Sequence, residues 1–268
     1  MKLQVNCGRR IGGQDMEKVR VLWSGLTGRT GREAISEVRK MDNIEIVGGI
    51  TRRLTGAMDF DLGVGCSKWY CYDDIANPLK ARPEGFDVIV DFSHPDCFEQ
   101  VVELAVRTHV PLISGTSGLS NRQMAMLYDA ASRIPVFRGG NFRFKVKKFI
   151  DEAVELAKMQ NGYFTLYENF YEGKSLPSET SKVIQRRFSE EVGKTIEVHS
   201  LANLPKKGLP CDWRIDLGTE LRNNLHCHTE GFSELAHDVL RIAAIMPKIP
   251  RSPGHLWSLD EIWDGLRV

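Results

Sequence analysis

Short apolar runs alternate with helical patterns along the first half of the chain. The runs contain too few polar residues to face water on one side, which is typical of strands buried in a parallel sheet. They span residues 19–24, 44–50, 86–92, 111–114 and 134–137. Apolar residues recur at helical spacing over 29–40, 95–108 and 121–132. Repeated strand–helix units predict a parallel sheet with right-handed crossovers, the doubly wound Rossmann-type α/β fold.

The pattern changes after residue 142. A helix is predicted over 145–159, and strand-like segments follow it, with one helix near 178–188 among them. The strand-like segments span 163–170, 195–201, 212–217 and 221–229. This mixture predicts a second, α+β domain that holds the substrate. A long amphipathic helix over 233–246 and a short capped helix over 258–263 are predicted after it.

Residues 1–15 are polar and aperiodic, and we expect them to form a disordered extension. Gly12-Gly13 could be encoded by a ribosome-binding sequence upstream of a Met16 codon. We therefore hypothesise that Met16 is the true start, and N-terminal sequencing of the native protein that finds Met1 would reject this. Both alternatives predict the same folded domains.

Charge and cysteine content narrow the class of partner. The net charge of +1 provides no electrostatic attraction to nucleic acid or to an anionic membrane. No apolar run is long enough to span a bilayer, and the N-terminus lacks the apolar core of a signal peptide. The six cysteines form no C-x-x-C pair, so we expect reduced thiols in a cytoplasmic protein. With nucleic acid and membrane excluded, the expected partner is a small-molecule substrate.

Three spaced glycines follow the first apolar run, and a helical pattern begins directly after them. Gly25 allows a sharp turn off the strand, Gly28 lets a pyrophosphate approach the backbone, and Gly31 allows close packing of helix and strand. The phosphates would bind the free N–H groups at the start of the helix. The spacing is G-x-x-G-x-x-G, a variant of the dinucleotide-binding fingerprint, and the alternative is a tight turn of an ordinary α/β protein.

The end of the second predicted strand indicates which dinucleotide binds. An acidic residue there would bind the ribose 2′-hydroxyl of NAD, but this chain has Thr51-Arg52-Arg53. Two guanidiniums suit a 2′-phosphate because arginine binds phosphate with two parallel hydrogen bonds. We therefore predict NADPH as the cofactor, with NADH possible. The alternative is a solvated basic loop.

Three further strand ends carry motifs: Asp91-Phe-Ser-His-Pro95, Ser114-Gly-Thr-Ser-Gly-Leu119 and Gly140-Asn-Phe142. In an open α/β sheet these loops gather at the ligand crevice beyond the carboxyl ends of the strands. Gly115, Thr116 and Gly118 are predicted to offer close backbone approach and free amides to a flat ring.

Taken in order, these motifs resemble those of the dihydrodipicolinate reductase family, a group of lysine-pathway enzymes. The resemblance runs from Val19 to a closing Pro253-Gly-His-Leu-Trp-Ser-Leu-Asp260. It implies that residues 16–142 and 233–268 form the dinucleotide-binding domain and that residues 143–232 form the domain for substrate and oligomerisation. It also implies a homo-oligomer, a dimer or tetramer assembled through the second domain's sheet.

The cofactor-binding residues are predicted from the motifs and from the resemblance together. They are Gly25, Thr27, Gly28, Arg29, Thr30, Gly31, Thr51, Arg52, Arg53, Phe92, Ser93, Gly115, Thr116, Asn141 and Phe142. The resemblance places the first five on the pyrophosphate turn, and Gly115, Thr116 and Phe142 against the nicotinamide.

The segment from Glu168 to Thr180 aligns with the family's catalytic loop but departs from it. Phe170 and Tyr171 stand where the family has two histidines, and Glu179 replaces a glycine, whereas Lys174 keeps its place. Reduction of a conjugated imine needs a proton source, and Lys174 and Tyr171 are the available donors. Ser178 and Thr180 match the family's substrate-binding positions. The alternative is a surface lysine beside a loop aromatic.

No metal site is predicted. His226 and His228 lie on one face of a predicted strand, but two ligands without a third are more typical of core or interface histidines. The sequence thus predicts an NADPH-dependent reductase that transfers hydride to a conjugated C=N or C=C bond of a small carboxylated substrate. The alternatives are a diverged paralogue acting on another substrate and a non-catalytic NADP(H)-binding protein.

Overall fold

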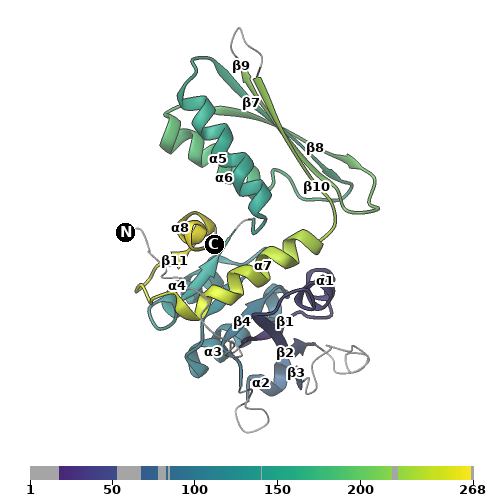
Figure 1. Cartoon of the computed structure of the whole chain (residues 1–268), viewed down its shortest axis with the longest axis vertical. Helices are drawn as coiled ribbons and strands as arrows, with labels where there is room; N and C mark the ends of the chain where they lie inside the picture. The colour runs from purple at the N-terminus through teal and green to yellow at the C-terminus, as the bar shows by residue number, and fades with distance from the viewer. Residues whose placement is uncertain are drawn as a thin grey trace, which may run out of the picture. The chain divides into compact units, whose positions relative to one another are not determined.

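The computed structural model describes residues 18–52, 68–77, 83, 85–139, 141–218 and 223–266. The chain divides into two compact units, one made of the residues up to Gly139 and those from Leu235 on, the other of Gly140–Glu234. Each unit is built around its own sheet (Figure 1). The predicted extension at residues 1–15 and the alternative starts lie outside the described residues.

The first unit contains a seven-stranded parallel sheet in the order β11-β6-β5-β4-β1-β2-β3. Its strands are β1 (Val19–Ser24), β2 (Ile44–Thr51), β3 (Lys68–Cys71), β4 (Val88–Asp91), β5 (Leu112–Ser114), β6 (Val136–Arg138) and β11 (Leu256–Trp257). Its helices are α1 (Arg29–Val38), α2 (Tyr72–Ile75), α3 (Pro95–Thr108), α4 (Asn121–Ala131), α7 (Ser233–Ile245), the 3-10 turn η2 (Met246–Lys248) and α8 (Leu259–Leu266). The predicted doubly wound fold is confirmed.

Buried side chains of α2, α3 and α4 form one core with residues of the central strands, among them Leu22, Ile89 and Leu112. Hydrogen bonds at their first residues set where two of these helices begin. His94 caps α3 by accepting from the Asp96 N–H, and Pro95 occupies the first turn. Ser120 starts α4 with a reciprocal capping box.

Beyond the predicted elements, the structure contains β3, α2 and β11. β3 lies at the edge of the sheet and is only half-buried, α2 spans a single turn, and β11 has two residues. Such short segments contain too few positions for an apolar period to emerge from the sequence.

An ion pair ties the amino-terminal ends of β1 and β4 together. Asp87 accepts from the Arg20 N–H at 2.8 Å, from Nε at 3.2 Å and from Nη2 at 2.9 Å. Burial raises the pKa of Asp87, but the hydrogen bonds and charge of Arg20 outweigh it, so the pKa lies below its ordinary value. The pair therefore stabilises the fold above the pKa of an unfolded aspartate and stops doing so as the pH falls through the lower folded value.

We expect Asp87→Asn to lower the free energy of unfolding at neutral pH by about 1 kcal/mol, a small value because both side chains are about a third exposed. The difference from wild type should shrink as the pH falls below about 4. Urea denaturation at both pH values measures this. Asp129→Asn, which removes an exposed pair with Arg133, is the control and should have little effect. Equal losses of unfolding free energy in Asp87→Asn and Asp129→Asn would contradict a stabilising role for the Arg20–Asp87 pair.

The second unit contains a four-stranded mixed sheet in the order β10-β9-β7-β8, in which β7 and β8 are parallel and the other pairs antiparallel. Its strands are β7 (Tyr163–Tyr171), β8 (Ile196–Leu204), β9 (Cys211–Gly218) and β10 (Asn223–Thr229). Its helices are α5 (Phe144–Lys158), α6 (Glu179–Arg187) and the π-helical turn η1 (Phe188–Val192). The helices pack on one face of the sheet, as Figure 1 shows, and the predicted α+β character is confirmed.

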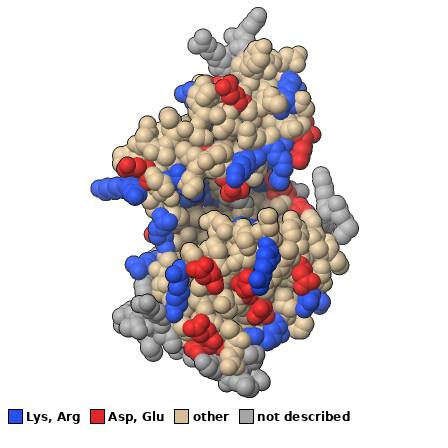
Figure 2. Space-filling model, turned by 180° about the vertical axis from the view of Figure 1, so that it is seen from behind, with Lys and Arg blue, Asp and Glu red and all other residues tan. Residues whose placement is uncertain are grey.

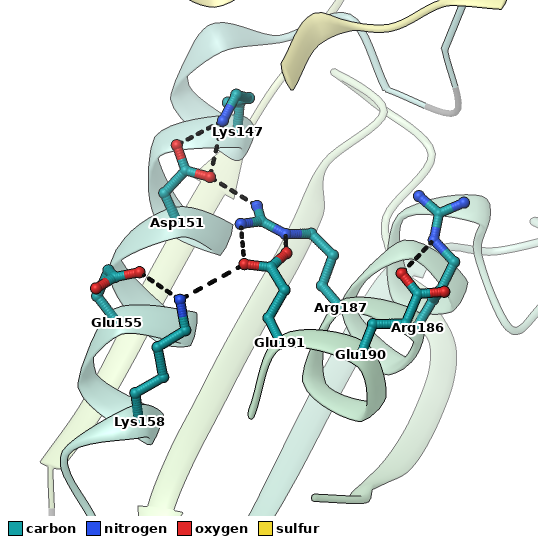
Figure 3. Close-up of polar contacts among 8 residues, drawn as sticks. All are labelled: Lys147, Asp151, Glu155, Lys158, Arg186, Arg187, Glu190 and Glu191. Carbon is teal, nitrogen blue, oxygen red and sulfur yellow. Dashed lines mark hydrogen bonds and ion pairs between the residues drawn. The ribbon is translucent and has the colours of Figure 1, made fainter. Parts of the chain in front are cut away.

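Ion pairs connect α5 to α6 and η1 (Figure 3). Asp151 of α5 accepts from Lys147 at 2.6 Å and from Arg187 at 2.6 Å. Arg187 also binds Glu191, which lies 3.7 Å from Lys158. Lys147 and Arg187 are largely buried, so this network holds α5 against α6 and η1.

Charges of both signs are interspersed on the visible face of each unit in Figure 2, consistent with the low net charge. Among the helices of the described residues, none combines the length and the apolar character needed to cross a bilayer. The same residues include no group of three histidine, cysteine or acidic side chains arranged to hold a metal ion.

Candidate functional site

The turn after β1 has the backbone geometry of a nucleotide-binding turn. Gly25 has a φ of +78°, which disfavours residues with a side chain, and its N–H donates to the Ile50 carbonyl at 3.0 Å. Gly28 is the N-cap of α1 and donates to the Gly25 carbonyl at 2.9 Å. The N–H groups of the first turn of α1 have no partners within the helix, so this helix end can bind pyrophosphate oxygens.

Two of the three glycines are required by backbone contacts, and the third borders open space. A Cβ on Gly31 would lie 2.3 Å from the Leu26 carbonyl oxygen, and one on Gly25 would lie 2.4 Å from the Phe92 carbonyl oxygen. A Cβ on Gly28 would meet only the Gly25 oxygen, at 3.0 Å. A phosphate can therefore approach at Gly28, where the absence of a side chain leaves a cradle.

The other residues predicted to line this turn differ in solvent exposure. Thr30 is buried, Thr27 is half-buried, and Arg29 is exposed. The Thr27 carbonyl accepts from Arg32 Nε at 3.0 Å, which fixes the turn against the helix.

At the end of β2, Thr51 is buried and Arg52 is exposed. The Arg52 carbonyl accepts from the Cys71 thiol at 3.0 Å, and its guanidinium lies beside the Cys97 thiol at the start of α3. Burial raises the pKa of Cys97, and the Arg52 charge acts in the opposite direction. One guanidinium therefore lies at the predicted strand end, whereas Arg53 lies outside the described residues.

A buried carboxylate joins the ends of β4 and β5. Asp91 is fully buried and accepts from Ser93 Oγ at 2.6 Å and from Thr116 Oγ1 at 2.7 Å. Burial raises the pKa of Asp91, and the hydrogen bonds together with the Arg138 charge oppose this rise. Asp91 thus orients two residues that the sequence predicts to contact the cofactor.

The loop residues around Asp91 use more of their hydrogen-bonding groups within the protein than predicted. The Thr116 hydroxyl donates to Asp91 and accepts from the Ser93 N–H at 2.9 Å. The prediction of a free amide at Gly115 is wrong, because that N–H donates to the Asp91 carbonyl at 2.8 Å. The Phe92 ring also covers Gly115, since a Cβ there would lie 2.3 Å from the ring. Thr116 and Gly115 shape the loops and offer a ligand little hydrogen bonding of their own.

Asn141 and Phe142 precede α5 in the second unit. Asn141 Nδ2 donates to Thr180 Oγ1 at 3.0 Å, and Asn141 Oδ1 accepts from the Arg143 N–H at 2.9 Å. Phe142 and Thr180 are buried. A predicted cofactor residue is thereby linked directly to a predicted substrate residue.

A second buried carboxylate anchors the start of α6. Glu168 of β7 accepts from the Ser178 N–H at 3.0 Å, from Ser181 Oγ at 2.5 Å and from Ser200 Oγ at 2.6 Å. The Ser178 hydroxyl caps α6 by accepting from the Ser181 N–H at 3.1 Å. These bonds fix the positive end of the α6 dipole against β7.

The predicted donors Tyr171 and Lys174 occupy the two ends of one β-turn. The Lys174 N–H donates to the Tyr171 carbonyl at 3.2 Å, and Gly173 between them has a φ of +86°. Tyr171 is half-buried, and Lys174 is exposed with its Nζ 5.9 Å from the centre of the Phe170 ring. The two candidate proton donors thus share a turn held by the backbone.

The structure explains two residues, Phe170 and Glu179, that differ from the pattern of the family's catalytic loop. Phe170 belongs to the core and meets Trp213 edge to face, with the ring centres 5.4 Å apart, so it supplies packing and no acid–base chemistry. The Glu179 carboxylate is paired with Lys182 at 2.6 Å, which offsets the negative charge that it brings to the start of α6.

His226 and His228 lie on the exposed face of β10, so neither is a core histidine. Both face Asp212 of β9, with His228 Nδ1 at 2.6 Å and His226 Nε2 at 3.3 Å from the same oxygen. Both histidines thus interact with the same carboxylate on the neighbouring strand β9.

Residues 19–142 match the family model described as "Dihydrodipicolinate reductase, N-terminus". In this part of the chain the protein is similar to the dihydrodipicolinate reductases. It is 29% identical over 181 residues to the 4-hydroxy-tetrahydrodipicolinate reductase of Anaplasma marginale, covering 65% of this chain and 66% of that protein. It is 35% identical over 139 residues to the Xanthomonas campestris pv. campestris (strain B100) enzyme of the same name, covering 52% and 54%. The chain therefore spans less than two thirds of these curated relatives.

A dihydrodipicolinate reductase from Paenisporosarcina sp. TG-14, solved with dipicolinate bound, has the same fold. Its TM-score is 0.64 at 16% identity, and the match covers 91% of this chain and 99% of that one. The resemblance to the dihydrodipicolinate reductases seen in the sequence motifs is thus confirmed.

Asp91 and Glu168 are the residues of the candidate site that sequence reasoning missed. Asp91 ends an apolar strand, and Glu168 interrupts one. A carboxylate at a buried strand position was the available signal, because a buried acid needs hydrogen-bond donors around it. Their partners lie far away in the sequence, so their roles emerge only in the fold. The cradle at Gly28 fits the pyrophosphate of a nicotinamide dinucleotide on the first unit.

Proposed function

We propose that this chain is an NADPH-dependent reductase that transfers hydride to a conjugated C=N or C=C bond of a small, carboxylated cyclic imine. The observation that carries the proposal is the combination of the Gly28 cradle with the turn that presents Tyr171 and Lys174. Support also comes from the chain's relatives, which are named for this reaction. In the diaminopimelate pathway the substrate would be the dihydrodipicolinate-type imine.

When bound, the nicotinamide would supply a hydride, that is, one proton together with two electrons, to the ring carbon of the substrate. As the hydride is transferred, an electron pair moves to the imine nitrogen, and the protein must supply the proton that this nitrogen takes up. The Lys174 ammonium can donate that proton or balance the developing and resident negative charge. Tyr171, three residues earlier in the same turn, is the second donor. Ser178 and Thr180 would orient the substrate at the start of α6.

The cofactor preference is testable at Arg52. We expect Arg52→Gln to raise the Kd for NADPH about tenfold while leaving that for NADH nearly unchanged, because only NADPH carries the 2′-phosphate. Titration of cofactor fluorescence measures both constants. Arg122→Gln, which removes an exposed guanidinium of α4, is the control and should bind both cofactors as wild type does. Equal loss of both cofactors in Arg52→Gln would contradict the NADPH assignment.

The alternative is a diverged paralogue without dihydrodipicolinate activity, including a non-catalytic NADP(H)-binding protein. It is favoured by Phe170, which is a core residue where the family has a histidine. The two are separated by supplying wild-type protein with NADPH and the dihydrodipicolinate-type imine. Oxidation of NADPH supports the reductase, whereas tight NADPH binding without turnover supports the alternative.

We also propose a cytoplasmic homo-oligomer. The described cysteines Cys71, Cys97, Cys211 and Cys227 are free thiols, which suits a reducing compartment. On the sheet face opposite α5 and α6, aligned residues of all four strands are exposed: His199, Tyr167, Arg214 and His226. Tyr167 stacks on His199 and lies under the Arg214 guanidinium. This face would bind a second copy, and sedimentation of the wild-type chain gives its oligomeric state.

A further inference from the structure

Two loops of the second unit meet where β7 and β8 end. The first is the turn from Tyr171 to Lys174. The second is the turn that begins at Lys206, whose carbonyl accepts from the Leu209 N–H at 3.1 Å. The Glu172 N–H donates to the Leu204 carbonyl at 3.1 Å, so the backbone holds the two loops together.

Lys206 lies against the first loop. A Cβ placed on Gly173 would be 3.8 Å from Lys206 Nζ and 3.9 Å from its Cε. Gly173 is the neighbour of Lys174, so the Lys206 ammonium adjoins the turn that carries Lys174. At these distances a Cβ at position 173 would be in ordinary van der Waals contact with the end of the Lys206 side chain.

Neither ammonium has an acidic partner within the described part of the chain. Other lysines of the same unit do: Lys147 lies 2.6 Å from Asp151, and Lys182 lies 2.6 Å from Glu179. Three acids lie close to the two loops. Glu172 lies inside the first turn, and Asp212, three residues after the second turn, faces His226 and His228. The Glu230 carboxylate lies over Gly208, inside the second turn.

Like charges held together repel each other, and an anion between them relieves this repulsion. The Lys174 charge reaches Cys211 at the start of β9: burial raises the pKa of that thiol, and Arg143 and, less strongly, Lys174 oppose the rise. Phe170, under Lys174, pairs with Cys211 across the sheet. The two ammoniums therefore border one end of the sheet and can face a common ligand.

We propose that Lys206 is a second substrate-binding cation which, together with Lys174, selects substrates that carry two carboxylates over those that carry one. This rests on the proposed reductase function. Lys174 serves the reacting end of the substrate, and Lys206 binds the remaining carboxylate. Lys206 is a specificity-determining residue and takes no part in proton transfer.

The test compares Lys206→Met with Lys207→Met in the full chain with NADP⁺ present. Both variants lose one exposed lysine from the same turn, so they match in net charge. The probes are dipicolinate, with two carboxylates, and picolinate, with one, and calorimetric titration measures each Kd. Wild type should prefer dipicolinate, and Lys206→Met should weaken dipicolinate about tenfold while leaving picolinate nearly unchanged. Lys207→Met should retain the preference, and Lys206→Arg should restore most of it.

Three results would overturn the inference. They are equal effects of Lys206→Met and Lys207→Met, equal weakening of both probes in Lys206→Met, and no preference for dipicolinate in wild type. If wild type reduces the cyclic imine while showing any of these, the proposed function stands and the role of Lys206 is rejected. If wild type neither binds dipicolinate nor oxidises NADPH with the imine, both are rejected.

Discussion

Lys174→Met is expected to lower kcat/KM for the cyclic imine about 100-fold. The substitution removes the ammonium that donates a proton or balances charge, while methionine keeps an unbranched apolar stem of similar length over Phe170. Steady-state oxidation of NADPH gives kcat and KM separately. A fall in kcat would assign proton donation to Lys174, and a rise in KM alone would assign substrate binding.

Lys194→Met is the matched control for Lys174→Met. Lys194 Nζ lies 5.3 Å from the centre of the Phe164 ring, at the other end of β7, so this variant loses a similar cation–ring contact. It should retain wild-type kinetics. A larger loss of kcat in Tyr171→Phe than in Lys174→Met would transfer the donor role to Tyr171. An unchanged rate in Lys174→Met would reject its catalytic assignment.

Gly31→Ala is expected to destabilise the protein by about 3 kcal/mol. The new Cβ would lie 2.3 Å from the Leu26 carbonyl oxygen and 2.5 Å from the Leu26 Cα, and backbone atoms cannot rotate away. The turn or α1 must then shift, and the pyrophosphate site moves with it. Chemical denaturation measures the loss of stability.

Gly28→Ala should behave differently because its backbone φ of −75° suits any residue and its Cβ meets only one atom, at 3.0 Å. We expect a loss of stability of about 1 kcal/mol, since alanine is a poor N-cap. The methyl group would nevertheless fill the phosphate cradle, so the Kd for NADPH should rise about tenfold or more. Wild-type affinity for NADPH in a folded Gly28→Ala protein would contradict the placement of the pyrophosphate.

The fold was predictable because strand and helix periods alternate clearly from Val19 onward. The predicted helix at 95–108 coincides with α3, and the strand predicted at 212–217 lies within β9. Short elements such as α2 and β11 were not predictable, because one helical turn or two strand residues contain no period. The π-helical turn η1 has no signature in the pattern that separates it from the end of α6.

The site was predictable only where adjacent residues determine it. The glycine turn is local, and its chemistry follows from spacing. The Tyr171–Lys174 turn is local too, but the roles of its residues come from the resemblance to the family's catalytic loop. The hydroxyl network of Asp91 depends on Thr116, and the approach of Lys206 to Gly173 depends on pairing between strands. Such contacts join residues about 25 to 33 positions apart, and no pattern in one sequence specifies them.

Transfer of a labelled hydride tests the central proposal most directly. Wild-type protein would be given the dihydrodipicolinate-type imine and NADPH deuterated at either the pro-R or the pro-S position of the nicotinamide C4. Mass spectrometry of the product measures the label. We predict that one of the two cofactors delivers a single deuterium to the reduced ring and that the other delivers none. Reduced product without deuterium from either cofactor, or no product while NADPH binds tightly, would contradict direct hydride transfer by this chain.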